Sequence, residues 1–467
     1  MKDLWKFIKS SGIYFVGTVL TKLVSFLLLP LYTSRISPAG YGTYDLYNTY
    51  MVFFCSVLFL DIWVGVMRFM FDQSGEDKKK PINCGIIIFI ISSILYVFVF
   101  IVISPVLKIE CTNYLVVCGL LMNVQNMVGY IIRGFGQNVL YAGSGLIGAI
   151  VTTGFNVILL VYFHMDFRAL FLASIIGYIV NIVIMILGMR EKNILAIRYL
   201  DRELFMEMIR FSLPLCLNSV AYWFLTSYDR IVVNNVLGPE ANGYYAVASR
   251  FGSLITLFTS CFHMAWQELA FSKSSTTQEL GDFYTIAVNA YIKTMGIGLI
   301  FLIPMISILY PILINNSYDV GKELIPLYLI GTILSAIGTF LGHIFGAIKK
   351  NQMQFWTMLV GSVVNFVTIH ICINSMGIQS TNIALSMGFL ALAVSRLILL
   401  KKELHIIIDY KNILVIVLGL LLMIWVYTRG SIILNLGAFL IAFIIVLFSY
   451  RNLIKLMIGK LCDKFGK

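Results

Sequence analysis

The chain has 467 residues, of which 60% are hydrophobic and only 12% are charged, and long apolar runs recur along its whole length. A water-soluble domain of this size has no interior that could bury so much apolar surface. The composition therefore excludes a soluble globular protein and predicts an all-α polytopic membrane protein.

Taken in chain order, the apolar runs predict about fourteen transmembrane helices. They lie at roughly 11–33, 43–71, 82–104, 112–132, 139–162, 169–189, 211–236, 241–267, 285–309, 324–348, 355–373, 380–400, 413–427 and 431–449. The segments that join them are short, and the external ones hold only about four to fifteen residues. No folded catalytic domain fits outside the membrane, so we expect no enzyme.

The formal net charge of +12 is distributed unevenly across the predicted membrane. About 23 of the 34 Lys and Arg residues fall in segments on one side, about 5 on the other and about 6 inside helices. Positive charge accumulates on the cytoplasmic side of membrane proteins, so both termini are predicted to be cytoplasmic. We interpret the basic segments as topology signals and contacts for anionic lipid, and we expect no nucleic acid partner.

An internal repeat organises the chain. Pro38, Gly42 and Tyr44 recur as Pro239, Gly243 and Tyr245 at an offset of 201, and a second frame at an offset of 213 pairs Gly129 with Gly342, Asn138 with Asn351 and Gly148 with Gly361. An even number of spans returns the chain to its starting side, so the two six-helix lobes are predicted to be parallel repeats, as in many transporters. The predicted parts are an N-terminal lobe at 1–189, a cytoplasmic connector at 190–210, a C-terminal lobe at 211–400, and two extra spans with a basic cytoplasmic tail at 401–467.

Motifs that resemble cofactor or metal sites lack the surroundings that such sites need. The segment Gly143 to Gly148 fits GxGxxG, but it lies inside an apolar span with no preceding strand, so small residues that let helices approach closely are the better interpretation. His343 and His370 could line a path, although helix packing accounts for them more simply. The eight cysteines form no CxxC pair. We expect no cofactor and no metal site.

Ionisable residues inside the spans carry the most functional information, because each costs about 2.5–3.5 kcal/mol at the bilayer centre. The set is Lys22, Asp45, Asp61, Arg68, Asp229, Arg230, Arg250, Lys293 and Arg396. Arg68 and Arg396 lie near the cytoplasmic ends of their helices, so we expect them to extend their charged groups to the interface. The others need a partner or a wet cavity.

Depth in the membrane suggests two pairs. Lys22 and Asp61 both lie about 15 Å from the cytoplasmic face at 1.5 Å per residue, and Asp229 and Arg250 lie about 11 and 14 Å from the outer ends of neighbouring antiparallel helices. Asp45 and Arg230 complete the set of ion-pair or coupling residues. The pairs are either structural or part of a substrate path. The surplus of cations, which includes Lys22, Arg250 and Lys293, favours an anionic substrate.

Polar and aromatic residues accompany these charges. Tyr44 and Asn48 share one helix face with Tyr41 and Asp45, and Asn123 and Asn126 share another. These side chains could contact sugars, but an aromatic belt at the membrane surface accounts for the outer tyrosines as well.

Two regions carry a resemblance to a known family. The stretch Ser227-Tyr228-Asp229-Arg230-Ile231, followed by Leu237-Gly238, Gly243-Tyr244-Tyr245 and Ala265-Trp266, resembles the seventh and eighth spans of Wzx-type polysaccharide flippases of the MOP superfamily. Leu29-Pro30-Leu31-Tyr32 and Gly40-Tyr41-Gly42-Thr43-Tyr44 are similar to the opening of these proteins. Length, span number and duplication agree over essentially the whole chain.

The resemblance implies movement of an undecaprenyl-pyrophosphate-linked oligosaccharide from the cytoplasmic to the outer leaflet of a bacterial plasma membrane. It implies alternating access through a cationic cavity, in which Lys22, Arg250 and Lys293 attract the pyrophosphate while Tyr and Asn side chains meet the sugars. A polysaccharide polymerase and glycosyltransferases are the expected partners. The alternatives are a lipid II flippase, a cation-coupled multidrug exporter and a membrane polysaccharide polymerase or ligase. The exporter is disfavoured because Lys22 stands where those proteins commonly carry an acid.

Overall fold

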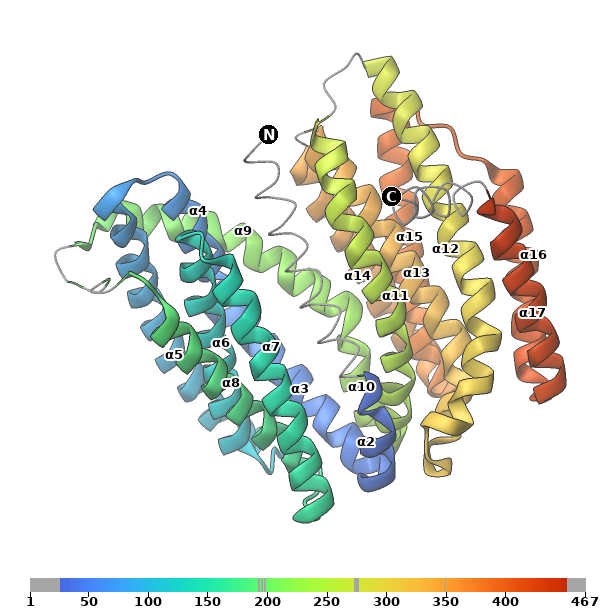
Figure 1. Ribbon diagram of the computed structural model, residues 1–467, viewed down its shortest axis with the longest axis horizontal. Coiled ribbons are helices and arrows are strands. Elements are labelled where there is room, and N and C mark those ends of the chain that lie inside the picture. Colours follow the sequence, from blue (N-terminus) through green and yellow to red (C-terminus); the bar gives the residue numbers. More distant parts are fainter. Residues whose placement is uncertain are drawn as a thin grey trace, which may run out of the picture. The chain divides into compact units, whose positions relative to one another are not determined.

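The computed structural model describes residues 26–191, 194, 196, 199–272, 277–348 and 350–451, and within them all regular structure is helical (Figure 1). The chain divides into two compact units, one of residues 1–253 with 362–384 and the other of residues 254–361 with 385–467. The units divide within helices, so they do not coincide with the predicted lobes, whose boundaries stay a prediction.

Unit 1 contains nine complete α-helices among its described residues. They are α2 (Leu29–Arg35), α3 (Pro38–Phe59), α4 (Ile62–Phe71), α5 (Lys79–Val106), α6 (Thr112–Gly134), α7 (Asn138–Val157), α8 (Arg168–Gly188), α9 (Arg202–Thr226) and α10 (Tyr228–Leu237). The first part of α11 (Pro239–Ser272), the second part of α14 (Asn351–Met376) and the start of α15 (Gln379–Leu404) also belong to it. Unit 2 holds the remaining parts of these three helices and α12 (Thr277–Leu313), α13 (Val320–Ala347), α16 (Tyr410–Thr428) and α17 (Ile432–Ser449).

The prediction of a polytopic helical membrane protein is confirmed. Among the described residues, eleven helices are long and apolar enough to cross a bilayer, and the bent pair α3 and α4 raises the number to twelve. These correspond to twelve of the fourteen predicted spans. The predicted span at 11–33 lies mostly outside the described residues, and the span at 241–267 lies in α11, which is long enough but does not belong to this apolar set.

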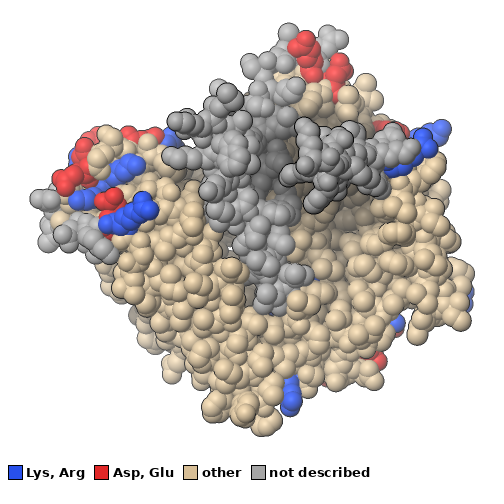
Figure 2. Space-filling model, viewed as in Figure 1, with Lys and Arg blue, Asp and Glu red and all other residues tan. Residues whose placement is uncertain are grey.

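The outer surface of unit 1 suits lipid. Ile90, Ile94, Phe98 and Ile101 are each more than half exposed and recur along one face of α5 at helical spacing. Charged side chains instead gather over the segment that joins α4 to α5 (Figure 2), where Arg68 with Asp72, Lys79 with Glu76 and Lys80 with Asp77 form ion pairs. This separation of an apolar flank from a charged end is expected of a membrane-spanning unit.

The repeated motif forms a close crossing of two helices. Pro38 and Pro239 begin α3 and α11, where a proline costs no helical hydrogen bond. A Cβ atom added to Gly42 would lie 1.8 Å from the carbonyl oxygen of Pro239, and one added to Gly243 would lie 1.9 Å from that of Pro38. The two copies of the motif therefore contact each other through backbone, and only glycine fits at either position.

The second frame also falls at equivalent places, because Asn138 and Asn351 begin α7 and α14. Between α3 and α4 the predicted span at 43–71 is broken, and the two helices meet at 44°. Leu60 and Asp61 at the break have φ angles of 55° and 50°. Residues other than glycine seldom adopt this left-handed conformation. The apolar pattern could not reveal this break, since hydropathy continues through it.

Candidate functional site

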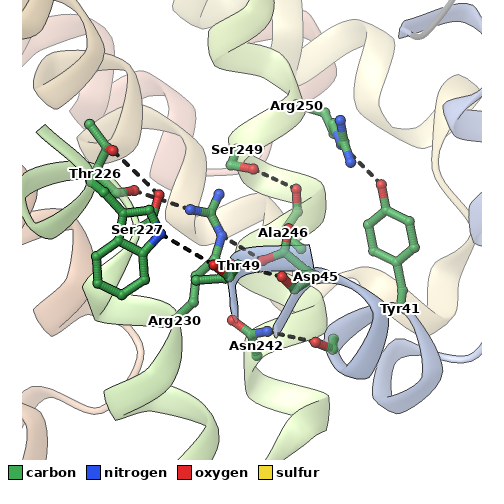
Figure 3. A network of polar contacts seen from close by, with 12 residues as sticks. Tyr41, Asp45, Thr49, Thr226, Ser227, Arg230, Asn242, Ala246, Ser249 and Arg250 are labelled. Atoms are coloured by element: carbon green, nitrogen blue, oxygen red, sulfur yellow. Dashed lines mark hydrogen bonds and ion pairs between the residues drawn. The ribbon is translucent and has the colours of Figure 1, made fainter. Parts of the chain in front are cut away.

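A buried ion pair joins α3 to α10. Asp45 Oδ2 accepts a hydrogen bond from Arg230 Nε at 2.5 Å, and the two side chains are 10% and 15% exposed. Arg230 Nη1 also donates to the carbonyl oxygen of Thr226 at 3.1 Å (Figure 3). Its guanidinium lies 5.5 Å from the ring centre of Tyr245. The charge of Arg230 is therefore already compensated within the protein.

The second arginine of this region lies in a different environment. Arg250 on α11 donates from Nε to the hydroxyl oxygen of Tyr41 on α3 at 3.0 Å, and its guanidinium lies 5.9 Å from the centre of the same ring (Figure 3). Among the described residues, no carboxylate lies within ion-pair distance of Arg250. Its two terminal nitrogens are thus available to an anion, for which a guanidinium offers a bidentate pair of donors. We call Asp45, Arg230, Tyr41 and Arg250 the arginine network.

Backbone contacts hold this network in place. The Asn242 side chain, which is fully buried, donates to the carbonyl oxygen of Gly42 at 2.7 Å. Trp223 Nε1 on α9 donates to the carbonyl oxygen of Thr49 at 3.3 Å. Because both contacts end on backbone atoms of α3, they fix its position against α9 and α11.

Asp229 does not form the predicted pair with Arg250. Its Oδ2 accepts a hydrogen bond from Asn365 on α14 at 3.2 Å, and the side chain is almost fully buried. Depth alone placed Asp229 and Arg250 at similar heights, but Asp229 faces α14 while Arg250 faces α3. The prediction of this pair was wrong for the conformation that the structure shows.

Asp61 lies at the break between α3 and α4. Its Oδ2 accepts a hydrogen bond from the hydroxyl of Ser219 on α9 at 2.6 Å. Lys22, the predicted partner of Asp61, lies outside the described residues, so this pair and the proposed role of Lys22 in substrate binding stay predictions.

The remaining predicted substrate contacts are dispersed. Tyr44 is half-buried beside the network, with its ring centre 6.0 Å from that of Tyr41, and Asn48 is half-buried one turn further along α3. Asn123 is instead fully buried and donates to the carbonyl oxygen of Gly119 in its own helix, α6. Asn126 is half-buried on α6, and Lys293 is exposed on α12 in unit 2. Only Tyr44 and Asn48 thus lie on the helix that carries Tyr41 and Asp45.

The two arginines that were expected to reach the interface differ. Arg68 is exposed and pairs with Asp72 at 2.6 Å, as expected. Arg396 is only 3% exposed and donates to Thr357 Oγ1, to the carbonyl oxygen of Gly338 and to that of Gln354, at 3.0, 2.6 and 3.3 Å. The expectation for Arg396 was wrong because backbone carbonyl groups of α13 and α14 accept its hydrogen bonds inside unit 2.

The histidines take part in packing contacts. His370 shares a hydrogen bond of 3.0 Å with the hydroxyl of Tyr228 in unit 1, and the ring of His343 lies 5.1 Å from that of His263 in unit 2. Among the described residues, no group of three His, Cys, Asp or Glu side chains could hold a metal ion.

Tyr41 of the network and Asn242, which supports it, were not among the predicted site residues. Tyr41 holds Arg250, and Asn242 joins α11 to α3. Tyr41 shares the helix face of Tyr44 and Asp45, and Asn242 lies inside the second copy of the repeated motif. The repeat itself was therefore the signal that could have identified both, because the two copies contact each other.

Comparison with known proteins agrees with this architecture. The model of the family described as "Polysaccharide biosynthesis protein" matches residues 7–266, more than half of the chain. A relative from Haemophilus influenzae strain Rd, "Lsg locus putative protein 1", is 24% identical over 268 residues, which cover 56% of this chain and 65% of the relative.

Two solved structures show the same fold. An inward-facing multidrug resistance MATE family transporter of the MOP superfamily has a TM-score of 0.68 at 13% identity, over 82% of this chain and 94% of its own. The lipid II flippase MurJ in an inward closed conformation has a TM-score of 0.66 at 17% identity, over 94% of this chain and 99% of its own. The chain has the MOP fold and belongs to the polysaccharide biosynthesis protein family, as its resemblance to Wzx-type flippases predicted.

Proposed function

We propose that the protein is a flippase that moves an undecaprenyl-pyrophosphate-linked oligosaccharide from the cytoplasmic to the outer leaflet of the bacterial plasma membrane. The observation that carries the proposal is the asymmetry of the arginine network. Arg230 is neutralised by Asp45, whereas Arg250 forms no ion pair with any of the described residues and hydrogen-bonds only through its Nε atom. Such a site favours an anionic ligand over a cationic one.

The pyrophosphate is the part of this substrate that crosses the bilayer least readily without a protein. A pyrophosphate carries about two negative charges, and even one charge at the bilayer centre costs several kcal/mol. A guanidinium can offer two parallel hydrogen bonds to phosphate oxygens. In the proposed cycle Arg250 binds the pyrophosphate, and Lys22 and Lys293 contribute at other stages of alternating access.

The other parts of the substrate need weaker contacts. Tyr44 and Asn48 lie on the same helix as Tyr41 and offer a ring and an amide to the sugars. The prenyl chain stays in lipid, beside apolar outer surfaces such as that of α5. Glycosyltransferases on the cytoplasmic side would supply the substrate, and a polymerase outside would consume it.

Substitution of Arg250 tests the proposal in cells of a strain that lacks the native copy of the gene. Arg250→Gln keeps much of the bulk but removes the charge. We expect at least a tenfold loss of surface polysaccharide, with accumulation of lipid-linked oligosaccharide in the membrane, because a hydrogen bond to a charged group contributes about 1.5–3 kcal/mol. Arg250→Lys should retain more export than Arg250→Gln.

Arg68→Gln is the matched control, since Arg68 is an exposed arginine whose partner Asp72 is also exposed. It should export normally at the same protein level. Full export by Arg250→Gln would refute the proposed anion site. A defect in cell wall synthesis with normal surface polysaccharide would identify a lipid II flippase, and increased drug sensitivity alone would identify an exporter.

A further inference from the structure

A polar cavity of about 220 Å³ lies within unit 1 among α2, α6, α7 and α8. It borders the arginine network, because the ring of Tyr32 in its wall stacks on that of Tyr41 with the ring centres 6.3 Å apart. One face of α7 lines it with Gly145, Gly148, Thr152 and Asn156, which follow one another at helical spacings of three and four. Part of the GxGxxG segment therefore faces this cavity. One water occupies about 30 Å³ in the liquid, so the cavity can admit a group of several heavy atoms.

Two amide oxygens in the wall lack hydrogen-bond partners. Asn156 and Asn181 are each only 4% exposed, and the Oδ1 atom of each is buried without a partner among the described residues. The amide nitrogen of Asn156 is already used, because it donates to the Tyr32 hydroxyl at 3.0 Å. A buried acceptor left unpaired costs about 1–3 kcal/mol, so a donor group that reached either oxygen would be favoured.

The described residues of the wall carry no charge. Besides the face of α7, their polar groups are amides and hydroxyls such as those of Gln125, Ser174 and Tyr178, and no Asp, Glu, Lys, Arg or His is among them. A cation would meet no counter-charge from these residues, and an isolated charge is costly in a medium of low dielectric constant. An uncharged ligand with several hydroxyl groups avoids that cost and can form hydrogen bonds with the amides and hydroxyls.

We propose that this cavity is a subsite for an uncharged sugar residue of the transported glycan, whose hydroxyl groups form hydrogen bonds with the amide and hydroxyl side chains of its wall, those of Asn156 and Asn181 among them. The inference rests on the proposed function, and it adds a second contact region to the anion site at Arg250. Gly145 and Gly148 have different roles in the cavity. Gly148 lets α7 approach α8, since a Cβ atom there would lie 3.0 Å from Asn181 Cβ, whereas a Cβ atom on Gly145 meets nothing within 4 Å.

Filling the cavity tests the subsite, and α7 offers a matched control. Gly145→Leu would extend a side chain into the cavity, while Gly143→Leu makes the same change on the same helix at an exposed position outside the lining, again with no atom within 4 Å of the new Cβ. We expect at least a tenfold loss of surface polysaccharide for Gly145→Leu and normal export for Gly143→Leu. Asn156→Leu, which removes one acceptor, should also lose export.

The affinity of the purified proteins for farnesyl pyrophosphate tests the anion site independently of the sugar subsite. The three variants should bind it like the wild-type protein, which also shows that they are folded. Normal export by Gly145→Leu and Asn156→Leu would overturn the subsite alone. Absence of farnesyl pyrophosphate binding in the wild-type protein would overturn the anion site instead.

A cation in the cavity is the competing occupant, and calorimetric titration with sodium chloride against choline chloride detects it. Saturable sodium binding by the wild-type protein that is lost in Gly145→Leu would overturn the sugar assignment. We expect no sodium binding that depends on this residue.

Discussion

Arg230 can remain charged inside unit 1 because Asp45 lies against it and the carbonyl oxygen of Thr226 takes a second hydrogen bond. Among the described residues, the guanidinium of Arg250 contacts the hydroxyl group and the ring of Tyr41 but forms no ion pair, although it lies in the same network. This difference between two arginines of one region makes Arg230 a structural residue in our account and Arg250 a ligand-binding one.

If the ion pair of Asp45 and Arg230 is structural, a substitution of Arg230 should restore stability that is lost when Asp45 is replaced. Asp45→Asn should lower the thermal midpoint of the purified protein, because breaking a buried ion pair by removing one partner costs about 3–5 kcal/mol. The remaining exposure of the two side chains places the expected cost at the lower end of that range. The double variant Asp45→Asn with Arg230→Gln should recover much of the loss. Strictly additive shifts would contradict the pairing.

The ionisable residues also show which properties of single residues can be predicted from the sequence. A rise of 1.5 Å per residue gives the depth of a side chain in the membrane but not the neighbour that it faces. Depth therefore identified Asp45, Asp61, Asp229, Arg230 and Arg250 as residues in need of partners, yet it paired Asp229 with Arg250 incorrectly. It also missed the burial of Arg396, because backbone carbonyl groups as acceptors leave no trace in the sequence.

At the scale of elements, the crossing of α3 and α11 depends on the absence of side chains. Gly42 and Gly243 lie where the backbone of one helix meets the proline carbonyl group at the start of the other. The repeat made both positions visible in the sequence, but not that they contact each other. Within unit 1, this crossing brings Tyr41 and Arg250 together.

A methyl group at the crossing should separate the two helices. Gly42→Ala would place its Cβ 1.8 Å from a backbone oxygen atom, which no rotamer change can relieve. Overpacking of this kind costs about 1–3 kcal/mol and sometimes more, so we expect a lower thermal midpoint and weaker export. Gly143→Ala, with no atom near the new Cβ, is the control in thermal unfolding. Equal midpoints for the two variants would refute the close crossing.

The break between α3 and α4 shows a limit of the same kind. Hydropathy predicted one long span at 43–71, and the helices on both sides of the break are indeed apolar. The left-handed conformations of Leu60 and Asp61 have only a weak signature in residue type, since neither residue is glycine and only aspartate is enriched in this region. The hydrogen bond from Ser219 to Asp61 is a tertiary contact that the local sequence does not encode.

At the scale of the whole molecule, charge asymmetry predicts topology. Ser74 and Glu110 are exposed beyond opposite ends of α5. In a cysteine-free background, Ser74→Cys should react with a membrane-impermeant maleimide only in inverted vesicles and Glu110→Cys only in intact spheroplasts, because basic segments stay cytoplasmic. Labelling of Ser74→Cys from outside would reverse the predicted orientation.

The central claim is that the protein itself moves a lipid-linked oligosaccharide between leaflets. The most direct measurement uses the purified protein in liposomes that contain an undecaprenyl-pyrophosphate oligosaccharide, and follows the fraction of glycan that an external glycosidase can reach. We predict that this fraction rises from about half in protein-free liposomes toward completion with the wild-type protein, and that it stays near half with Arg250→Gln. Equal access with and without the wild-type protein, under each ion gradient and membrane potential applied, would contradict the account.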